Sequence, residues 1–359
     1  MSGSTMSPVL RGSWLYGTVL LTLACYAVTI AFAPAAGHPP AAALGTLLFL
    51  GTSVHVASTA WFWTVGAVRR HMLASPGRYL VAPAVLVAGS ALLAAALPAA
   101  AFGWVLPGFL AWQFFHFQKQ NLGLAALAAT SYGAGGLSRS ERRAVTGAGL
   151  AGIVGLLARP GLLQLGVDPR LEPLRPFAAA GYGLCVLAGL ALLVRRPRGR
   201  RPVPFVLVQL LCLLFFLPAF CFDSPYAAVA GLTAAHGYQY LVIMGLVAAG
   251  GRRAGLDRLL SLALLLNIAL LLGTGLNLAS HLHGASAPGG RALYGGYLGL
   301  VAAHFVVDAG LWRLRDAFPR AFLADRLPYL VPHPRPSQPT GRPGDPTAGT
   351  PVPAGGRGD

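Results

Sequence analysis

Charge is scarce in this chain. Only 10% of the 359 residues are charged, whereas soluble domains carry roughly 25%. Acidic residues are the rarest, 10 against 27 lysines and arginines, so the formal net charge is +17. The basic excess does not predict nucleic-acid binding, because the arginines lie in short loops between apolar stretches. With 55% hydrophobic residues and a mean hydropathy of +0.62, the composition predicts a membrane protein.

Two kinds of motif are also missing. The four cysteines have no CxxC spacing and lie mostly in apolar stretches, which favours buried free thiols over a disulfide or a metal site. The HxxxH and HxxHH boxes are absent, which disfavours the membrane desaturases and the fatty-acid hydroxylases.

Several apolar stretches exceed the roughly 18 residues that a spanning helix needs. They predict an all-α, polytopic transmembrane helix bundle of about ten helices, formed as one domain by residues 1–330. Residues 331–359 are rich in proline and glycine and are predicted to form a disordered cytoplasmic tail. The expected spans are 13–33, 44–67, 79–97, 104–128, 141–158, 177–194, 203–222, 226–249, 257–276 and 293–313.

The loops between these spans alternate in charge. Loops on the side of the termini hold fifteen arginines, and the opposite loops hold four. The positive-inside rule therefore predicts that both termini are cytoplasmic. We expect the protein to lie in the inner (plasma) membrane of a cell, with the lipid bilayer as its partner. Ser138 and Glu141 have the spacing of a capping box, which predicts the start of the fifth helix.

Four of the nine histidines lie near the middle of an expected span, and the other five lie in loops or in the tail. The spans that carry them all run from outside to inside, so the four side chains should share one depth within ~5 Å. Polar side chains at that depth usually face the protein interior and serve a purpose. These residues are His55, His116, His236 and His304.

A second polar layer follows one turn further along. Gln120, Tyr240 and Asp308 each come four residues after a histidine, and Lys119 and Gln239 come three after. Imidazole suits iron, zinc and copper, and a ligating histidine usually donates its second N–H to a neighbour. We therefore predict a metal site with four histidine ligands. Asp308 would be a fifth ligand or an orienting partner, and Gln120, Gln239 and Tyr240 would orient ligands or bound oxygen.

Lys119 and Asp308 are the clearly intramembrane charges. An ion pair between them that fixes helix packing is one reading, and a catalytic role is the other. For the histidines themselves, hydrogen bonding between packed helices is the alternative to metal binding.

The FFHF segment around His116, with single histidines on several other spans, resembles the Brp/Blh family of bacterial and archaeal membrane carotene-cleaving dioxygenases. In that family four histidines hold a non-haem iron, and O2 splits the central double bond of beta-carotene. The resemblance implies an iron-dependent membrane oxygenase with a lipophilic small-molecule substrate. The chain departs from the pattern where His304 is followed by Asp308, since the family has paired histidines one turn apart, and where the fourth helix continues as QKQNLG. These departures leave the substrate open, either a carotenoid or another lipid, and allow a different reaction.

Other hypotheses on the metal, the cofactor and the function remain open at this point. Zinc or copper could replace iron, and the four histidines could bind haem in two axial pairs. A transporter could use the histidine, aspartate and lysine side chains as an ion or proton relay. A purely structural membrane protein would not need the second polar layer.

Overall fold

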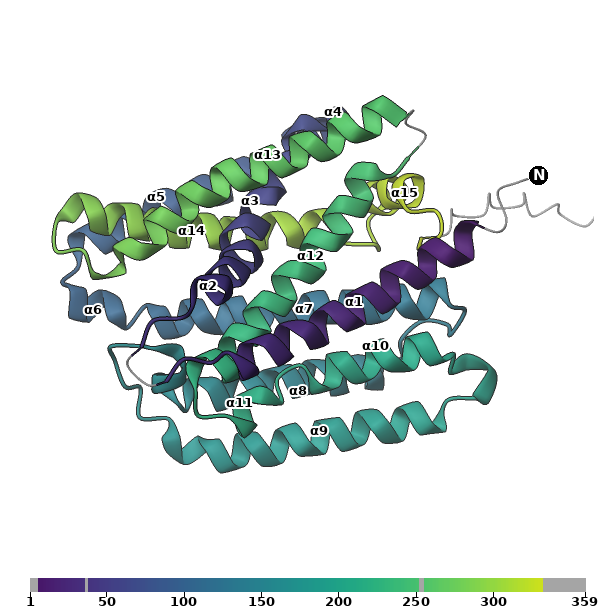
Figure 1. The fold of residues 1–359 in the computed structure, drawn as a ribbon, viewed down its shortest axis with the longest axis horizontal. Helices are drawn as coiled ribbons and strands as arrows, with labels where there is room; N and C mark the ends of the chain where they lie inside the picture. The colour runs from purple at the N-terminus through teal and green to yellow at the C-terminus, as the bar shows by residue number, and fades with distance from the viewer. Residues whose placement is uncertain (1–5, 36–37, 252–254, 332–359) are drawn as a thin grey trace, which may run out of the picture.

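The computed structural model describes residues 6–35, 38–251 and 255–331, and within those ranges every regular element is helical (Figure 1). The helices are α1 (Met6–Ala31), α2 (Ala42–Phe49), α3 (His55–Ser58), α4 (Gly66–Leu73), α5 (Ala82–Ala96), α6 (Ala99–Gly103), α7 (Leu106–Ser131), α8 (Arg139–Leu157), α9 (Arg175–Arg195), α10 (Val203–Leu214), α11 (Pro218–Cys221), α12 (Gly231–Ala249), α13 (Gly255–Ser280), α14 (Pro288–Leu311) and α15 (Ala317–Arg326). Segments with π-helical hydrogen bonding are η1 (Leu50–Val54), η3 (Gly77–Val81) and η7 (Tyr226–Ala230). Segments with 3-10 geometry are η2 (Thr59–Thr64), η4 (Pro160–Leu163), η5 (Glu172–Leu174), η6 (Arg198–Arg200) and η8 (His281–Gly284).

The all-helical fold and the multi-span character agree with the prediction. Seven helical segments of the described residues are long and apolar enough to cross a membrane. The other three expected spans are also helical, but α7 and α8 fall short in hydropathy and α10 has only 12 residues. A count of ten spans therefore stays a prediction. The seven segments are Pro8–Ala31, Ala42–Thr64, Gly77–Ala96, Glu172–Arg195, Tyr226–Ala249, Gly255–Gly284 and Pro288–Leu311.

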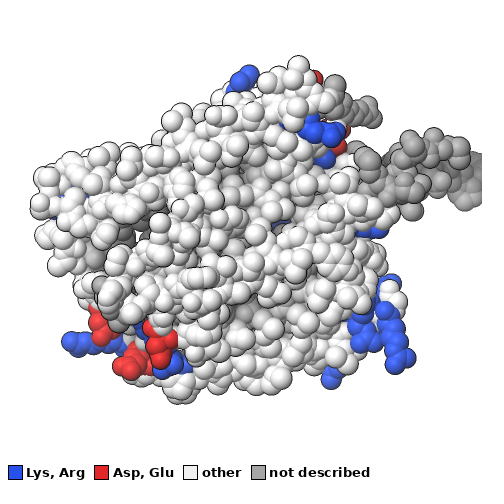
Figure 2. All heavy atoms as spheres, in the orientation of Figure 1, with Lys and Arg blue, Asp and Glu red and all other residues white. Residues whose placement is uncertain are grey.

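On the face shown in Figure 2, charged side chains gather at the two ends of the molecule, and few lie between them. Basic atoms predominate at the end where α4, α15 and the start of α1 lie, whereas acidic and basic atoms mix at the other end. At the mixed end Arg159 forms an ion pair with Asp223. This distribution has the asymmetry that the loop arginines predict.

A reporter fused after residue 330 is expected to be cytoplasmic, and one inserted in the 281–290 loop is expected to be external. The physical reason is the arginine bias between alternate loops. Protease protection or a compartment-specific enzyme reporter measures both positions. If both reporters lie on one side, the predicted topology is wrong.

Small residues allow close packing between several of the helices. Gly295 and Gly299 of α14 face the backbone of α5, where a Cβ on Gly299 would lie 2.6 Å from the Cα of Val87. This Gly-xxx-Gly spacing is the arrangement by which membrane helices approach closely.

The predicted start of the fifth helix is confirmed. Ser138 accepts from the Glu141 amide at 3.2 Å, and the Glu141 carboxylate accepts from the Ser138 amide at 2.7 Å, so the capping box closes. The same carboxylate is paired with Arg196 of the α9–α10 connection, whose guanidinium also donates to the Ala134 carbonyl at 2.7 Å. These bonds tie the ends of α7, α8 and α9 together.

The C-terminal part differs from the expected outline. After α14 the chain forms α15, a helix that hydropathy did not indicate, and its Leu323 and Ala324 are buried in the main hydrophobic cluster. The predicted disordered tail lies outside the described residues, apart from Val331, which is buried. The four cysteines are free, as the sequence predicts, but only Cys25 and Cys212 are buried, whereas Cys185 is half-buried and Cys221 is exposed.

Candidate metal centre

The four predicted histidines come together in the structure. The helical segments that carry them run in the same direction through the bundle (Figure 1). Their ring centroids lie 5.1 Å apart for His55–His236, 5.3 Å for His55–His304, 5.0 Å for His116–His236 and 5.2 Å for His116–His304. Three of the rings are buried and His116 is half-buried. Four helical segments that run in the same direction thus bring their histidines into one cluster.

The free nitrogens of this cluster are its most informative feature. Nε2 of His55, His116 and His304, and both ring nitrogens of His236, are buried without a hydrogen-bond partner among the described residues. Leaving a buried polar atom unpaired costs roughly 1–3 kcal/mol. Each of the four clustered histidines therefore carries at least one such unpaired nitrogen, a deficit that a bound ion would reduce.

Two of the imidazole rings are held in orientation by a contact at Nδ1. The Nδ1 of His55 lies 2.7 Å from the carbonyl oxygen of Gly51, and the Nδ1 of His304 lies 2.7 Å from Oγ1 of Thr59. When Nδ1–H donates to a carbonyl, the lone pair is on Nε2, which is the form that binds a metal. The side chains can supply ligand atoms within 4.8 Å of one another in two overlapping sets, His55–His236–His304 and His116–His304–Asp308.

Asp308 completes a hydrogen-bonded chain beside the cluster. Its Oδ2 lies 3.5 Å from Nε2 of His304, and its Oδ1 accepts from the Tyr240 hydroxyl at 2.9 Å. The Tyr240 oxygen is also 2.9 Å from Oγ1 of Thr59. Thr59 and Asp308 therefore hold His304 and Tyr240 from two sides. Thr59 was missed in the sequence, although it follows His55 by the same four residues that single out the other members of the second layer.

Gln120 and Gln239 act one layer further out. The Gln120 amide donates to the backbone oxygen of His236 at 2.9 Å and to Oε1 of Gln239 at 3.1 Å. Gln239 in turn donates to Oγ1 of Thr22 on α1 at 2.8 Å. These amides fix the backbone of α12 beside His236, so they position the ligand helix and do not face the ring nitrogens.

Lys119 does not join the cluster. Its side chain is exposed and its ammonium group lies 5.1 Å from the centroid of the Phe115 ring, whereas Asp308 is buried against His304 and Tyr240. The expected ion pair between Lys119 and Asp308 is therefore wrong. On a helix a residue three positions after His116 points about 60° to one side of it, and on α7 that direction leads out of the bundle.

The helix around His55 is irregular, where the sequence predicts a regular span. The π-helical η1 directly precedes His55, and the 3-10 segment η2 follows α3. Single π-helical turns inside α-helices are frequent at functional sites. Here the wider turn places the Gly51 carbonyl within reach of the His55 ring.

Glycines bring the His55 and His236 helices into close contact. A Cβ added to Gly51 would lie 2.8 Å from the Cα of Ala234, and a Cβ on Gly237 would overlap the carbonyl oxygen of Gly51. Gly237 directly follows His236 in the chain. The closest approach of the two helices is thus next to the two histidines.

Aromatic rings cover the sides of the cluster. Phe117 stacks on His236 with ring centroids 4.0 Å apart, and Phe305 stacks on His116 at 4.5 Å. The stacked rings and the short histidine–histidine distances leave no space for a macrocycle. The arrangement fits an ion and not a haem held by axial pairs.

Comparison of the chain with protein-family models, with curated proteins and with solved structures gives no match. The resemblance to the carotene-cleaving dioxygenases thus stays a prediction from short segments, and the geometry of the site carries the functional argument.

Asp308→Asn is expected to lower the metal affinity of the site by roughly 10–100-fold, as loss of a partner that orients a ligand does. The amide keeps the size of the side chain but removes its negative charge. Metal titration of the purified protein measures the change, and Asp325→Asn, at an exposed position of α15, is the control. A loss as complete as that of a histidine variant would instead make Asp308 a direct ligand.

Proposed function

We propose that this membrane protein binds one non-haem metal ion, iron, through His55, His116, His236 and His304, and that it is an oxygenase for a lipophilic substrate. The observation that carries the proposal is the cluster of four histidines whose buried imidazole nitrogens lack partners among the described residues.

The donor set fits such an ion. Neutral imidazole suits iron, zinc and copper, and a carboxylate near the histidines favours iron among these three metals. Burial keeps the rings neutral and ready to bind, since a charged ring would have to be desolvated. The resemblance to the dioxygenases favours iron within this group. Iron at this position would supply activation of dioxygen.

The chain's own residues would prepare the site in three ways. Gly51 and Thr59 hold Nδ1 of two rings, so that their Nε2 atoms face inward. Tyr240 and Asp308 limit the movement of His304. Phe117 and Phe305 exclude water from two sides. The substrate must be lipophilic because the surrounding helices are apolar and are buried in a bilayer, and a carotenoid or an unsaturated lipid satisfies this condition.

Metal analysis of the protein, purified in mild detergent without a chelator, tests the proposal. Stoichiometric iron supports it, and zinc or copper in its place would retain the site but exclude iron. The absence of any stoichiometric metal would overturn it. Oxygen consumption with added carotenoid or unsaturated lipid then tests the reaction class.

One observation favours a second candidate, an ion or proton relay. The irregular helix around His55 resembles the broken helices that transporters place at their binding sites. All the residues of η1 and η2 nevertheless remain hydrogen-bonded in helical turns. A metal-free protein that acidifies or alkalinises the lumen of vesicles would favour the relay.

A further inference from the structure

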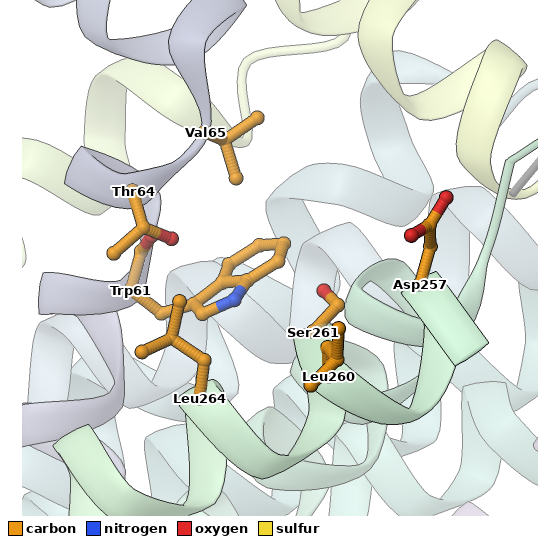
Figure 3. A pocket seen from close by; sticks show the side chains of 7 residues that line it. All are labelled: Trp61, Thr64, Val65, Asp257, Leu260, Ser261 and Leu264. Atoms are coloured by element: carbon orange, nitrogen blue, oxygen red, sulfur yellow. The ribbon is translucent and has the colours of Figure 1, made fainter.

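A second cavity lies away from the histidines, at the basic end of the bundle. It has a volume of about 360 Å³, lies between η2 and the first turns of α13, and opens to the surface beside the exposed Asp257 (Figure 3). Trp61 forms one wall, Asp257 lies at the opposite side, and Ser261 lies between them. None of these side chains belongs to the metal centre.

Two oxygen-bearing groups in this cavity have no partner among the described residues. The Ser261 side chain is 6% exposed and its hydroxyl has no hydrogen-bond partner within the described part of the chain. In Figure 3 the hydroxyl is directed toward the space beside the Trp61 ring. Asp257 likewise has no ion pair or hydrogen bond to another described residue. A carboxylate and a hydroxyl that face one space are suited to a ligand that donates hydrogen bonds and carries positive charge.

The Trp61 wall favours the same ligand. The face of a tryptophan ring attracts cations, with an energy of about 0.5–2 kcal/mol. A primary ammonium group can satisfy all three walls, because its three N–H groups can donate to Asp257 and Ser261 while its charge lies near Trp61. A quaternary ammonium group has no N–H to donate, and an anion would be repelled by Asp257.

Apart from Thr64, the remaining lining is apolar, and part of it is exposed on the outside of the bundle. Leu260 and Leu264 of α13 line the cavity and are 58% and 44% exposed, and α13 is one of the segments long enough to cross a membrane. On the other side, the Arg69 guanidinium donates to the Trp63 carbonyl at 3.5 Å, next to Thr64 of the cavity wall. A phospholipid has an amine, a phosphate and an acyl chain, and each of these groups would thus find a suitable neighbour here.

We propose that this cavity is a binding site for a phospholipid with a primary ammonium headgroup, of the phosphatidylethanolamine type. The amine lies between Asp257, Ser261 and Trp61, the phosphate lies toward Arg69, and an acyl chain follows Leu260 and Leu264. The source is a lipid and not a free amine because the leucines continue from the cavity along the outside of α13.

The test uses the full-length protein in detergent micelles with added dioleoyl phosphatidylethanolamine, phosphatidylcholine or phosphatidylglycerol, or with free ethanolamine. Native mass spectrometry counts bound lipid, and thermal unfolding measures stabilisation. We expect the wild type to bind the ethanolamine lipid at least roughly tenfold more tightly than the choline lipid, as charge-assisted hydrogen bonds require. Free ethanolamine should bind far more weakly.

Asp257→Asn should remove the preference between the two lipids, and Ser261→Ala should reduce it several-fold. Asp325→Asn, an exposed acid on α15, should leave the preference unchanged. Equal binding of both lipids by the wild type, or a preference that survives in Asp257→Asn, would overturn the proposal. If free ethanolamine competes as well as the lipid, the lipid assignment is wrong. Metal content is measured on the same samples and should not change.

Discussion

Alanine at any one of the four clustered histidines is expected to reduce bound metal by more than about 100-fold, beyond the 10–100-fold that loss of an orienting partner costs. Each histidine contributes a nitrogen that has no other partner, so its removal leaves three ligands and an open coordination position. Elemental analysis of the purified variants, referred to protein concentration, measures the loss. The residues are His55, His116, His236 and His304.

The four losses should be similar and should not add. The loss in a double variant is expected to be smaller than the sum of the two single losses, because ligands of one ion are coupled. His71→Ala is the matched control, since His71 stacks on Phe318 with ring centroids 4.1 Å apart, well away from the cluster. His333→Ala is a second control, at a position outside the described residues. If one of the four variants keeps full metal content, that histidine is not a ligand.

The clustering of the four histidines could be predicted from the sequence because hydropathy and loop charge are local properties. Once the spans and their direction are drawn, residues at the middle of parallel helices must share a level. His236 and His304 are far apart in the chain, yet their positions within their spans already placed them together. The capping box at Ser138 was predictable for the same reason, since both of its partners lie within one turn.

The lateral arrangement could not be predicted in the same way. Whether Lys119 faces Asp308 depends on how far α7 is rotated about its axis, and the residue lies on the exposed side. The amphipathic pattern in the sequence of a membrane helix is too weak to predict that rotation. The partner of His304 is Thr59, 245 positions away, and only tertiary packing shows that contact.

The irregular turns and α15 were missed for a different physical reason. The segment Leu50–Val54 has no sequence pattern that marks a π-helical turn, and it packs closely against α12 at Gly51. The helix α15 is amphipathic and short, so no long apolar run marks it, although Phe322 packs edge-on against Phe62 with ring centroids 6.5 Å apart.

The contact between the His55 and His236 helices leads to a second prediction with a large expected effect. Gly237→Ala should lower the stability of the protein by about 1–3 kcal/mol or more, as overpacking of a filled interior does. The new methyl group would overlap the Gly51 carbonyl oxygen, which is the acceptor for the His55 ring. The helices must then separate, and His55 loses both its orientation and its place beside His236. Metal content should fall together with stability.

Gly245→Ala is the matched control, because Gly245 lies on the same helix and an added Cβ there meets nothing within 4 Å. Alanine is the better helix former by about 1 kcal/mol, so this variant should be as stable as the wild type or more stable, and it should keep its metal. Thermal unfolding in detergent and elemental analysis measure both variants side by side. If Gly237→Ala behaves like Gly245→Ala, the two helices do not cross as closely as the structure has them, and the orientation of His55 by Gly51 must have another basis.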